Sequence, residues 1–266
     1  MVLGLALTLL AAACGGPDDA KGATGAGATG RAAPSSSTPP PTAAVPVSKP
    51  CLRGGSVEPF RFTTSAGASL VGVALGSGRT GLVLGHQAGS DLCEWLPHAR
   101  SFARKGYRVL AIDFEGSGDS QAGSGPDARL DTDVVAAAAQ LRQRGASKIV
   151  LIGSSMGGTA VLSAATRVSP PVAGVVSLSG PAEYQGVDAK AALSRLRVPV
   201  LLAASADDYP FAGDARAMYR VAPVQDKHLL IIPGGAHGTS MIEFGDDAPK
   251  VLAALEKFIA DHTGTG

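Results

Sequence analysis

Residues 148–158 constrain the fold of this chain most, because they join the signals of a strand, a tight turn and a helix. Residues 149–152 (I-V-L-I) are a short apolar run rich in β-branched side chains, as expected for a buried strand of a parallel sheet. The turn, residues 153–157, reads G-S-S-M-G, and an apolar segment with a helical composition follows at residues 159–165. A G-x-S-x-G motif between a strand and a helix is typical of a nucleophile elbow.

Ser155, the middle residue of this motif, is the candidate nucleophile. The elbow would hold its hydroxyl at the carboxyl edge of the sheet, and side chains in place of Gly153 or Gly157 would collide with neighbouring backbone. The alternative is that Ser155 is an ordinary cap of the following helix. The two interpretations differ in whether a base and a carboxylate accompany the serine.

A serine hydroxyl needs a base to take its proton and a carboxylate to orient that base, and on this scaffold the chain order is serine, acid, histidine. Three histidines follow Ser155. His228 lies within a predicted strand and His262 in the last turn of a predicted helix. His237 lies in a glycine-flanked loop just after a strand, so we expect it to be the base, although a solvated loop residue is the alternative.

The acid should follow the predicted strand that lies between the serine and the histidine. That strand ends in the sequence S-A-D-D-Y at residues 205–209. Adjacent aspartates point in different directions, so only one can serve. We expect Asp208 to orient His237 and keep Asp207 as the alternative acid, and the aspartate that does not serve could cap the next helix.

Two backbone N–H groups should stabilise the oxyanion that forms during acyl transfer. Met156 can supply one of them from the N-terminus of the helix, where the helix dipole helps. The second is expected from the loop at residues 86–90, with Ala88 as first choice and Gln87 as second. His86 is expected to be a structural hydrogen-bonding residue rather than a base.

Strands and helices alternate along the chain after an opening hairpin, which predicts a parallel sheet with helices on both faces. Strands are expected at residues 57–64, 69–75, 81–85, 107–113, 148–152, 172–179, 198–204 and 227–232. Helices are expected at residues 95–105, 131–144, 159–165, 189–196, 214–222 and 249–262. Ligands bind at the carboxyl ends of the strands in such a sheet.

Five short motifs, each at the end of a predicted strand, together resemble the α/β-hydrolase superfamily. They are H-Q-A-G at residues 86–89, D-F-E-G-S-G-D-S at 113–120, G-S-S-M-G at 153–157, S-A-D-D at 205–208 and G-A-H at 235–237. Gln87 stands where the family usually has glycine, and Glu115 where it usually has arginine. The resemblance implies an α/β-hydrolase fold with about eight mostly parallel strands, and it places the acid on Asp208.

A serine at the nucleophile position implies acyl transfer to water, as in the esterases, lipases, thioesterases and peptidases of this superfamily. We expect an exported hydrolase of carboxylic esters that acts on a small-molecule acyl ester and needs no cofactor or metal. The alternatives are a peptidase or thioesterase on the same triad, and an inactive tethered binding protein. Only residues 180–197 separate the sixth and seventh strands, so we expect a minimal cap or none.

The N-terminal region resembles an export signal followed by a tether. Residues 2–13 are apolar and end in small residues before Cys14, as in the lipobox of bacterial lipoproteins, where this cysteine is lipidated. The alternative is a plain secreted protein. Residues 15–50 are rich in Gly, Ala, Ser, Thr and Pro and predict a disordered tether, so the hydrolase domain is expected at residues 51–266. Acyl chains on Cys14 would anchor the protein to a membrane surface.

Composition narrows the range of partners. The net charge is +1 and aromatic residues make up 5% of the chain, which argues against a nucleic-acid partner. The three cysteines form no C-x-x-C motif, which argues against a thiolate metal site. If the chain is exported, Cys51 and Cys93 are expected to form a disulfide, with two separate buried thiols as the alternative.

Overall fold

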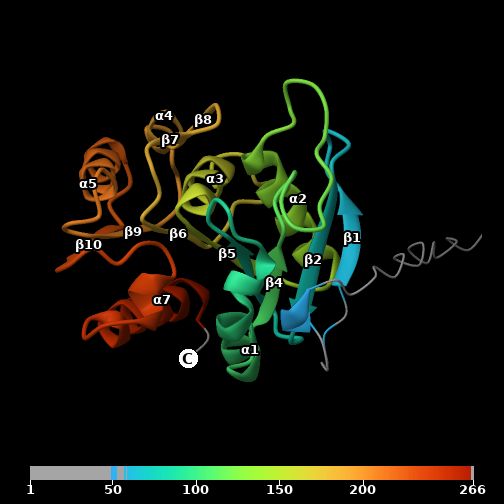
Figure 1. The fold of residues 1–266 in the computed structure, drawn as a ribbon, viewed down its shortest axis with the longest axis horizontal. Coiled ribbons are helices and arrows are strands. Elements are labelled where there is room, and N and C mark those ends of the chain that lie inside the picture. Colours follow the sequence, from blue (N-terminus) through green and yellow to red (C-terminus); the bar gives the residue numbers. More distant parts are fainter. Residues whose placement is uncertain (1–48, 53–56, 58, 265–266) are drawn as a thin grey trace, which may run out of the picture. The chain divides into compact units, whose positions relative to one another are not determined.

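An eight-stranded sheet forms the centre of the described part of the chain, which in this computed structural model comprises residues 49–52, 57 and 59–264. Its strands are β1 (Pro59–Thr63), β2 (Ser69–Leu75), β3 (Thr80–Gly85), β4 (Arg108–Ile112), β5 (Lys148–Ser154), β6 (Gly174–Leu178), β9 (Val200–Ser205) and β10 (Lys227–Ile232). They are ordered β1-β2-β4-β3-β5-β6-β9-β10 across the sheet (Figure 1).

Neighbouring strands of this sheet are parallel, except that β2 is antiparallel to both β1 and β4. Gly85 at the end of β3 is level with Gly153 in β5, and Ser205 at the end of β9 is level with Ile232 at the end of β10. The loops that carry the predicted oxyanion, serine, acid and histidine motifs therefore all leave the sheet at the carboxyl ends of its parallel strands.

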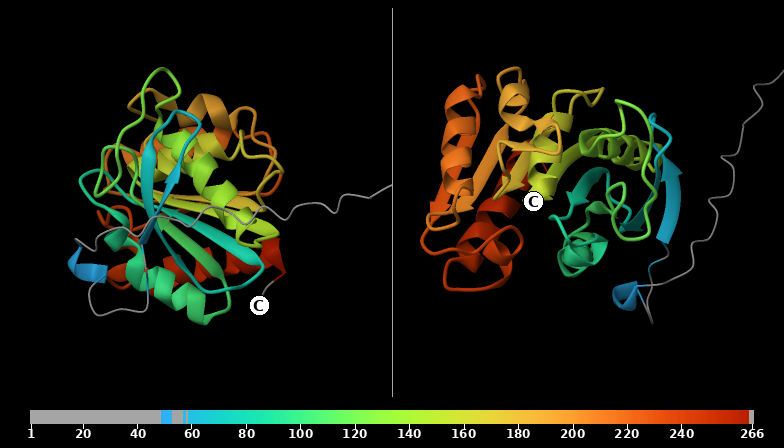
Figure 2. Two further views of the ribbon diagram at one scale, coloured as in Figure 1. Left: turned by 90° about the vertical axis from the view of Figure 1, so that its right-hand side faces the viewer. Right: turned by 45° about the horizontal axis from the view of Figure 1, so that its top comes forward.

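Helices cover both faces of the sheet, as predicted. The helices are α1 (Leu96–Arg104), α2 (Leu130–Gln143), α3 (Met156–Ala164), α4 (Ala189–Leu193), α5 (Phe211–Val221), α6 (Ser240–Glu243) and α7 (Ala248–Thr263). Helices α2 to α5 pack on one face, and α1, α6 and α7 pack on the other (Figures 1 and 2). The predicted fold class is thus confirmed.

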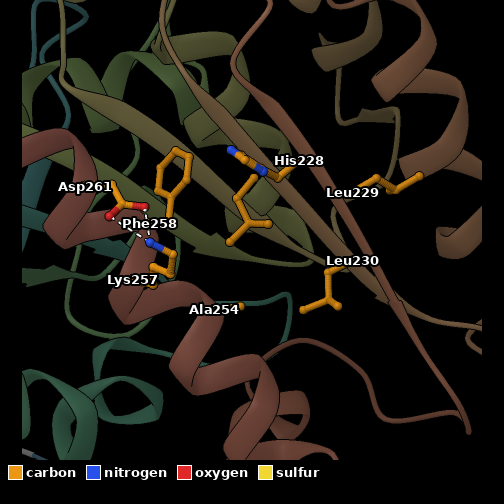
Figure 3. Close-up of a pocket in the computed structure, with 8 residues that line it drawn as sticks. His228, Leu229, Leu230, Ala254, Lys257, Phe258 and Asp261 are labelled. Carbon is orange, nitrogen blue, oxygen red and sulfur yellow. Dashed lines mark hydrogen bonds and ion pairs between the residues drawn. The ribbon is translucent and has the colours of Figure 1, made fainter.

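Strand β10 forms one edge of the sheet, and a cavity of about 270 Å³ lies between it and α7 (Figure 3). Leu201, Leu230 and Phe258 give the cavity an apolar lining. Lys257 and Asp261, which also line it, form an ion pair of 2.9 Å with each other. No residue of the predicted triad lines this cavity, so it is separate from the predicted catalytic residues.

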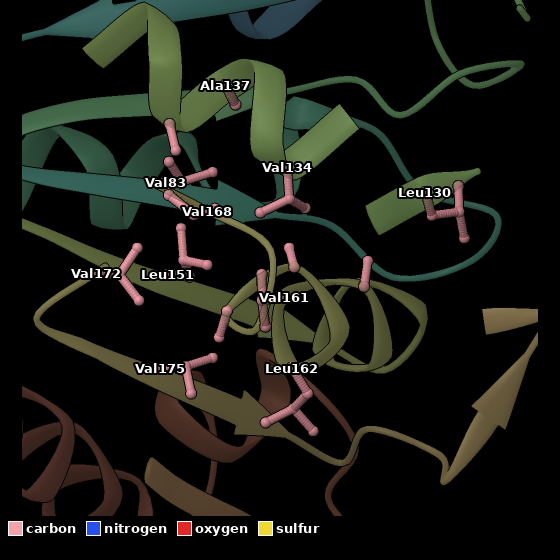
Figure 4. Close-up of a cluster of buried hydrophobic side chains, with 14 of the residues drawn as sticks. Val83, Leu130, Val134, Ala137, Leu151, Val161, Leu162, Val168, Val172 and Val175 are labelled. Atoms are coloured by element: carbon pink, nitrogen blue, oxygen red, sulfur yellow. The ribbon is translucent and has the colours of Figure 1, made fainter. Parts of the chain in front are cut away.

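The side chains of β5 alternate between two hydrophobic clusters. Leu151 belongs to the cluster beneath α2 and α3, where Figure 4 shows it on the same side of the strand as Val134 and Val161. Val150 and Ile152 belong to the cluster beneath α1 and α7. Each of these β5 side chains is fully buried, and such burial contributes about 1.5–3 kcal/mol per residue. A strand that is apolar on both faces is what a central position in a parallel sheet requires.

Most predicted elements are present, with shifted ends. The helix predicted from residue 159 begins at Met156, and the helix predicted from residue 214 begins at Phe211. A small hairpin of β7 (Glu183–Tyr184) and β8 (Val187–Asp188) was not predicted. Residues 180–197 hold only this hairpin and α4, so the segment between β6 and β9 forms a minimal cap.

A disulfide and an ion pair link the N-terminal end of the described chain to the segment after β3. Cys51, in the 3₁₀ helix η1 (Pro50–Leu52), forms the predicted disulfide with Cys93, in the 3₁₀ helix η2 (Leu92–Glu94). Lys49 Nζ lies 2.7 Å from Asp91 Oδ2 and 3.3 Å from Asp113 Oδ2. Lys49, two residues before the expected domain boundary at Cys51, therefore also contacts the domain.

The predicted export signal at residues 1–14, its lipidation site Cys14 and most of the predicted tether lie outside the described residues. Within the described residues, no helix combines the length and the apolar character that a membrane crossing requires.

Candidate active site

Ser155 occupies a sharp turn between β5 and α3. Its backbone angles are φ 47° and ψ −116°, a conformation that is strained for any residue with a side chain and that clusters at functional sites. A Cβ at Gly153 would lie 2.2 Å from Gly157 O, and a Cβ at Gly157 would lie 2.3 Å from Gly85 O. Both glycines of the motif are therefore required by close backbone contacts, as predicted, and they hold Ser155 in an elbow rather than in an ordinary helix cap.

The N-terminus of α3 is joined to the loop after β3. Helix α3 begins at Met156, directly after the serine, and Gly157 N donates a hydrogen bond of 3.1 Å to His86 O. Met156 N–H has no acceptor within the described residues, as expected for the first N–H of a helix. The structure thus leaves this candidate oxyanion donor free.

His237 and Asp208 form a hydrogen-bonded pair. His237 Nδ1 lies 2.8 Å from Asp208 Oδ2 and 3.0 Å from Asp208 Oδ1. Asp208 is buried, whereas Asp207 is exposed and its backbone N–H donates to Gly234 O. The structure therefore pairs the histidine with the first-choice aspartate. Asp207 does not cap α5, whose N-cap position is Pro210, so that expectation was wrong.

The loop that carries His237 is held from two sides. Ser205 Oγ, at the end of β9, donates a hydrogen bond of 2.6 Å to Ala236 O. The ring of Phe211 lies on the other side, with its centroid 4.5 Å from that of the His237 ring. These contacts fix the backbone before the imidazole and the ring itself.

The same loop packs against the nucleophile elbow. A Cβ at Gly238, whose φ is +58°, would lie 3.3 Å from Ser154 Cβ and 2.6 Å from Gln87 Oε1. The residue after His237 therefore touches both the residue before Ser155 and the loop after β3. Gln87 Oε1 is buried and has no hydrogen-bond partner within the described residues.

His86 is a structural residue, as predicted. Its Nε2 accepts a hydrogen bond of 3.1 Å from Phe114 N, so its hydrogen lies on Nδ1, which donates to Gln87 O at 2.8 Å. Burial lowers the pKa of the imidazole, which favours this neutral form. Both ring nitrogens are used by backbone groups, so His86 is not available as a base.

The loop after β3 offers one free N–H group. Gln87 N donates a hydrogen bond of 2.9 Å to Glu94 Oε2, whereas Ala88 N has no acceptor within the described residues. This geometry favours Ala88 over Gln87 as the second oxyanion donor. Sequence reasoning missed Glu94, because no motif marks a carboxylate seven residues after the loop backbone that it binds.

The described residues contain no group of three or more His, Cys, Asp or Glu side chains arranged to hold a metal ion.

The comparisons with known proteins agree with this fold. The model of the α/β-hydrolase fold family matches residues 82–200, which include the elbow and the loop after β3. This match and the sheet topology show an α/β-hydrolase fold. No curated protein matches the sequence.

Solved structures with this fold include several enzymes. A monoacylglycerol lipase from Paleococcus ferrophilus is 18% identical, with a TM-score of 0.62, over 73% of this chain and 99% of the lipase. An esterase from a Rhodococcus species is 19% identical, with a TM-score of 0.63, over 77% of this chain and 99% of the esterase. An esterase from Pyrococcus furiosus is 15% identical, with a TM-score of 0.63, over 77% of this chain and 92% of the esterase. At these identities the likeness establishes the α/β-hydrolase fold.

Proposed function

We propose that this chain is a serine hydrolase that cleaves carboxylic esters through an acyl-enzyme. The observation that carries the proposal is the strained Ser155 at the edge of the sheet where the His237–Asp208 pair also lies. A strained backbone conformation of this kind persists only where the surrounding structure enforces it, and such residues cluster at active sites. A serine that served only as a helix cap would need neither the strain nor the paired histidine.

In the proposed reaction, Ser155 Oγ attacks the ester carbonyl while His237 takes the hydroxyl proton and later gives it to the leaving alcohol. Asp208 holds the histidine by Nδ1–H and stabilises the imidazolium that forms. The N–H groups of Met156 and Ala88 stabilise the oxyanion. Water then attacks the acyl-enzyme with His237 as base, which releases the acid and restores the serine.

Two features support a small or surface-borne ester as substrate. The cap is minimal, so no large lid covers the serine. The structural neighbours include esterases and a monoacylglycerol lipase, although the likeness to them is one of fold.

Export of the protein is part of the proposal, with or without a lipid anchor on Cys14. The Cys51–Cys93 disulfide supports it, since disulfides persist in oxidising compartments.

A fluorophosphonate probe and a panel of p-nitrophenyl esters test the proposal. The protein should be labelled at one serine and should hydrolyse short-chain esters, and Ser155→Ala should lose both properties. Ser194→Ala, at the exposed C-terminal end of α4, is the matched control and should keep them. Labelling with turnover only of peptides or thioesters would redirect the substrate class. A protein that is neither labelled nor active would be an inactive binding protein.

A further inference from the structure

Glu94 links the two segments that form the proposed oxyanion site. It is the last residue of η2, and its two carboxylate oxygens bind different partners. Oε2 accepts from Gln87 N at 2.9 Å, and Oε1 accepts a short hydrogen bond from Ser154 Oγ. One side chain thus bridges the loop after β3 and the residue before Ser155.

The two residues that flank Glu94 are both held in place by bonds to other segments. The residue before it, Cys93, is bound to Cys51, and Cys93 N donates to Asp91 Oδ1 at 2.8 Å. The residue after it, Trp95, is fully buried and its Nε1 donates to Gly85 O at 2.9 Å. The carboxylate therefore projects from a fixed position toward the edge of the sheet.

The two ends of Gln87 are both held. Glu94 accepts from its N–H, and His86 Nδ1 donates to its carbonyl oxygen at 2.8 Å. The carbonyl of Gln87 and the N–H of Ala88 belong to one planar peptide group, so fixing the first fixes the direction of the second. The hydrogen bonds to Gln87 thereby set where Ala88 N–H points.

We infer that Glu94 is a positioning residue that holds the Ala88 N–H in the direction required for the oxyanion and ties it to the elbow through Ser154. This inference rests on the proposed function. Preorganised donors act mainly on the transition state. Loss of Glu94 should therefore lower kcat while leaving KM nearly unchanged.

The test compares Glu94→Ala with Glu94→Gln. The glutamine can still accept from Gln87 N and can donate to Ser154 Oγ, whose hydroxyl can turn to Gly85 O, 3.4 Å away. We expect Glu94→Ala to lose about tenfold to a hundredfold in kcat, with KM changed less than about threefold, since removing an oxyanion donor outright costs about 10²–10³. Glu94→Gln should stay within about threefold of the wild type. Glu256→Ala, a change on α7 that breaks an exposed ion pair with Lys105, is the control.

Two further measurements separate this role from a merely structural one. Ser154→Ala combined with Glu94→Ala should lose no more kcat than Glu94→Ala alone, because the two side chains act as a unit. Hydrogen exchange at Gln87 N–H should quicken at least about tenfold in Glu94→Ala and stay slow in Glu94→Gln, whether or not the protein is active.

An unchanged kcat in Glu94→Ala would overturn the inference, as would a loss that appears only in KM or equally in the glutamine variant. If the wild type is neither labelled by the fluorophosphonate probe nor active on esters, the proposed function is wrong, whatever the role of Glu94. The exchange rate of Gln87 N–H then still decides whether Glu94 holds this loop, and an unchanged rate would refute that too.

Discussion

Ser205 Oγ donates a hydrogen bond of 2.6 Å to the carbonyl oxygen of Ala236, the residue before His237. Ser205 is the last residue of β9 and Ala236 follows the parallel neighbouring strand β10, so this bond couples the loop of the proposed acid to the loop of the proposed base. The side chains of the proposed acid and base are thus positioned by a connection between their loops as well as by their own hydrogen bond.

Replacing Ser205 by alanine should loosen this connection. The Ala236 carbonyl would lose its partner, at a cost of about 1–3 kcal/mol in the free energy of unfolding. We also expect kcat/KM for an ester to fall about threefold to tenfold, because small displacements of a catalytic base are costly. Urea unfolding and steady-state kinetics check both effects, with the exposed Ser194→Ala as the control. Kinetics equal to those of the wild type would show that the bond does not position His237.

Gly238→Ala should disturb the contact between the histidine loop and Gln87. The new Cβ would lie 2.6 Å from Gln87 Oε1, at a residue whose φ is +58°. We expect kcat/KM to fall about tenfold, since the clash lies beside His237. Gly186→Ala is the matched control, because its φ is +76° but nothing lies within 4 Å of the added Cβ.

Shortening Gln87 should then relieve part of the Gly238→Ala defect. The double variant Gln87→Ala/Gly238→Ala should be more active than the sum of the two single effects predicts, because the two residues are in contact. Strictly additive losses would mean that the backbone strain, and not the contact, causes the defect.

Asp133 should make the protein less stable as the pH rises. Burial raises the pKa of this carboxyl to about 8, the charges of Glu115 and Asp131 add to the effect, and the hydrogen bond from Glu115 N opposes it. Between about pH 4 and pH 8 the folded protein keeps a proton that the unfolded chain releases. This term therefore destabilises the fold progressively across that window, by on the order of 1 kcal/mol per pH unit, and levels off above it.

Asp133→Asn should remove this pH dependence because the amide does not titrate, and its oxygen can still accept from Glu115 N. Urea unfolding at pH 5, 7 and 9 should show the free energy of the variant gaining on that of the wild type as the pH rises. Asp261→Asn, at an exposed position on α7, should follow the wild-type slope. Parallel curves for wild type and Asp133→Asn would show that the buried carboxyl does not titrate in this window.

Loss of the Cys51–Cys93 disulfide should destabilise the domain. The two cysteines are 42 residues apart, and closing a loop of this length in the unfolded chain is worth roughly 4 kcal/mol in the chain-entropy model. The double variant Cys51→Ser/Cys93→Ser should unfold at lower urea concentration than the oxidised wild type and should match the reduced wild type. Identical unfolding of reduced and oxidised wild type would contradict the prediction.

The central part of the fold was readable from the sequence because its signals are local. The apolar run of β5 and the motif around Ser155 lie within one short stretch. Chain order left three candidate histidines, and the glycine-flanked loop after a strand selected His237 among them. The helix after the elbow was placed too late, because Gly157 and Gly158 have low helix propensity. Added Cβ atoms at these two positions would clash with Gly85 O and Ser177 Oγ, so the packing requires glycine there despite that propensity.

Other features depend on contacts between distant residues, and no local pattern reveals them. Glu94 binds Ser154, 60 residues further along the chain. The β7–β8 hairpin has two-residue strands and turns at Gln185 and Gly186, where φ is 46° and 76°. Glutamine is not a usual turn residue, so Gly186 alone marks that turn in the sequence.

Trp95 is the single tryptophan of the chain, and it is fully buried. Through its bond to Gly85 O, the indole ring is fixed to the strand that ends directly before the loop that carries Ala88. The tryptophan emission of the protein should therefore arise from one place next to the proposed oxyanion site. The chain thus carries an intrinsic optical probe, and ligands or inhibitors that move this loop should shift its spectrum without any added label.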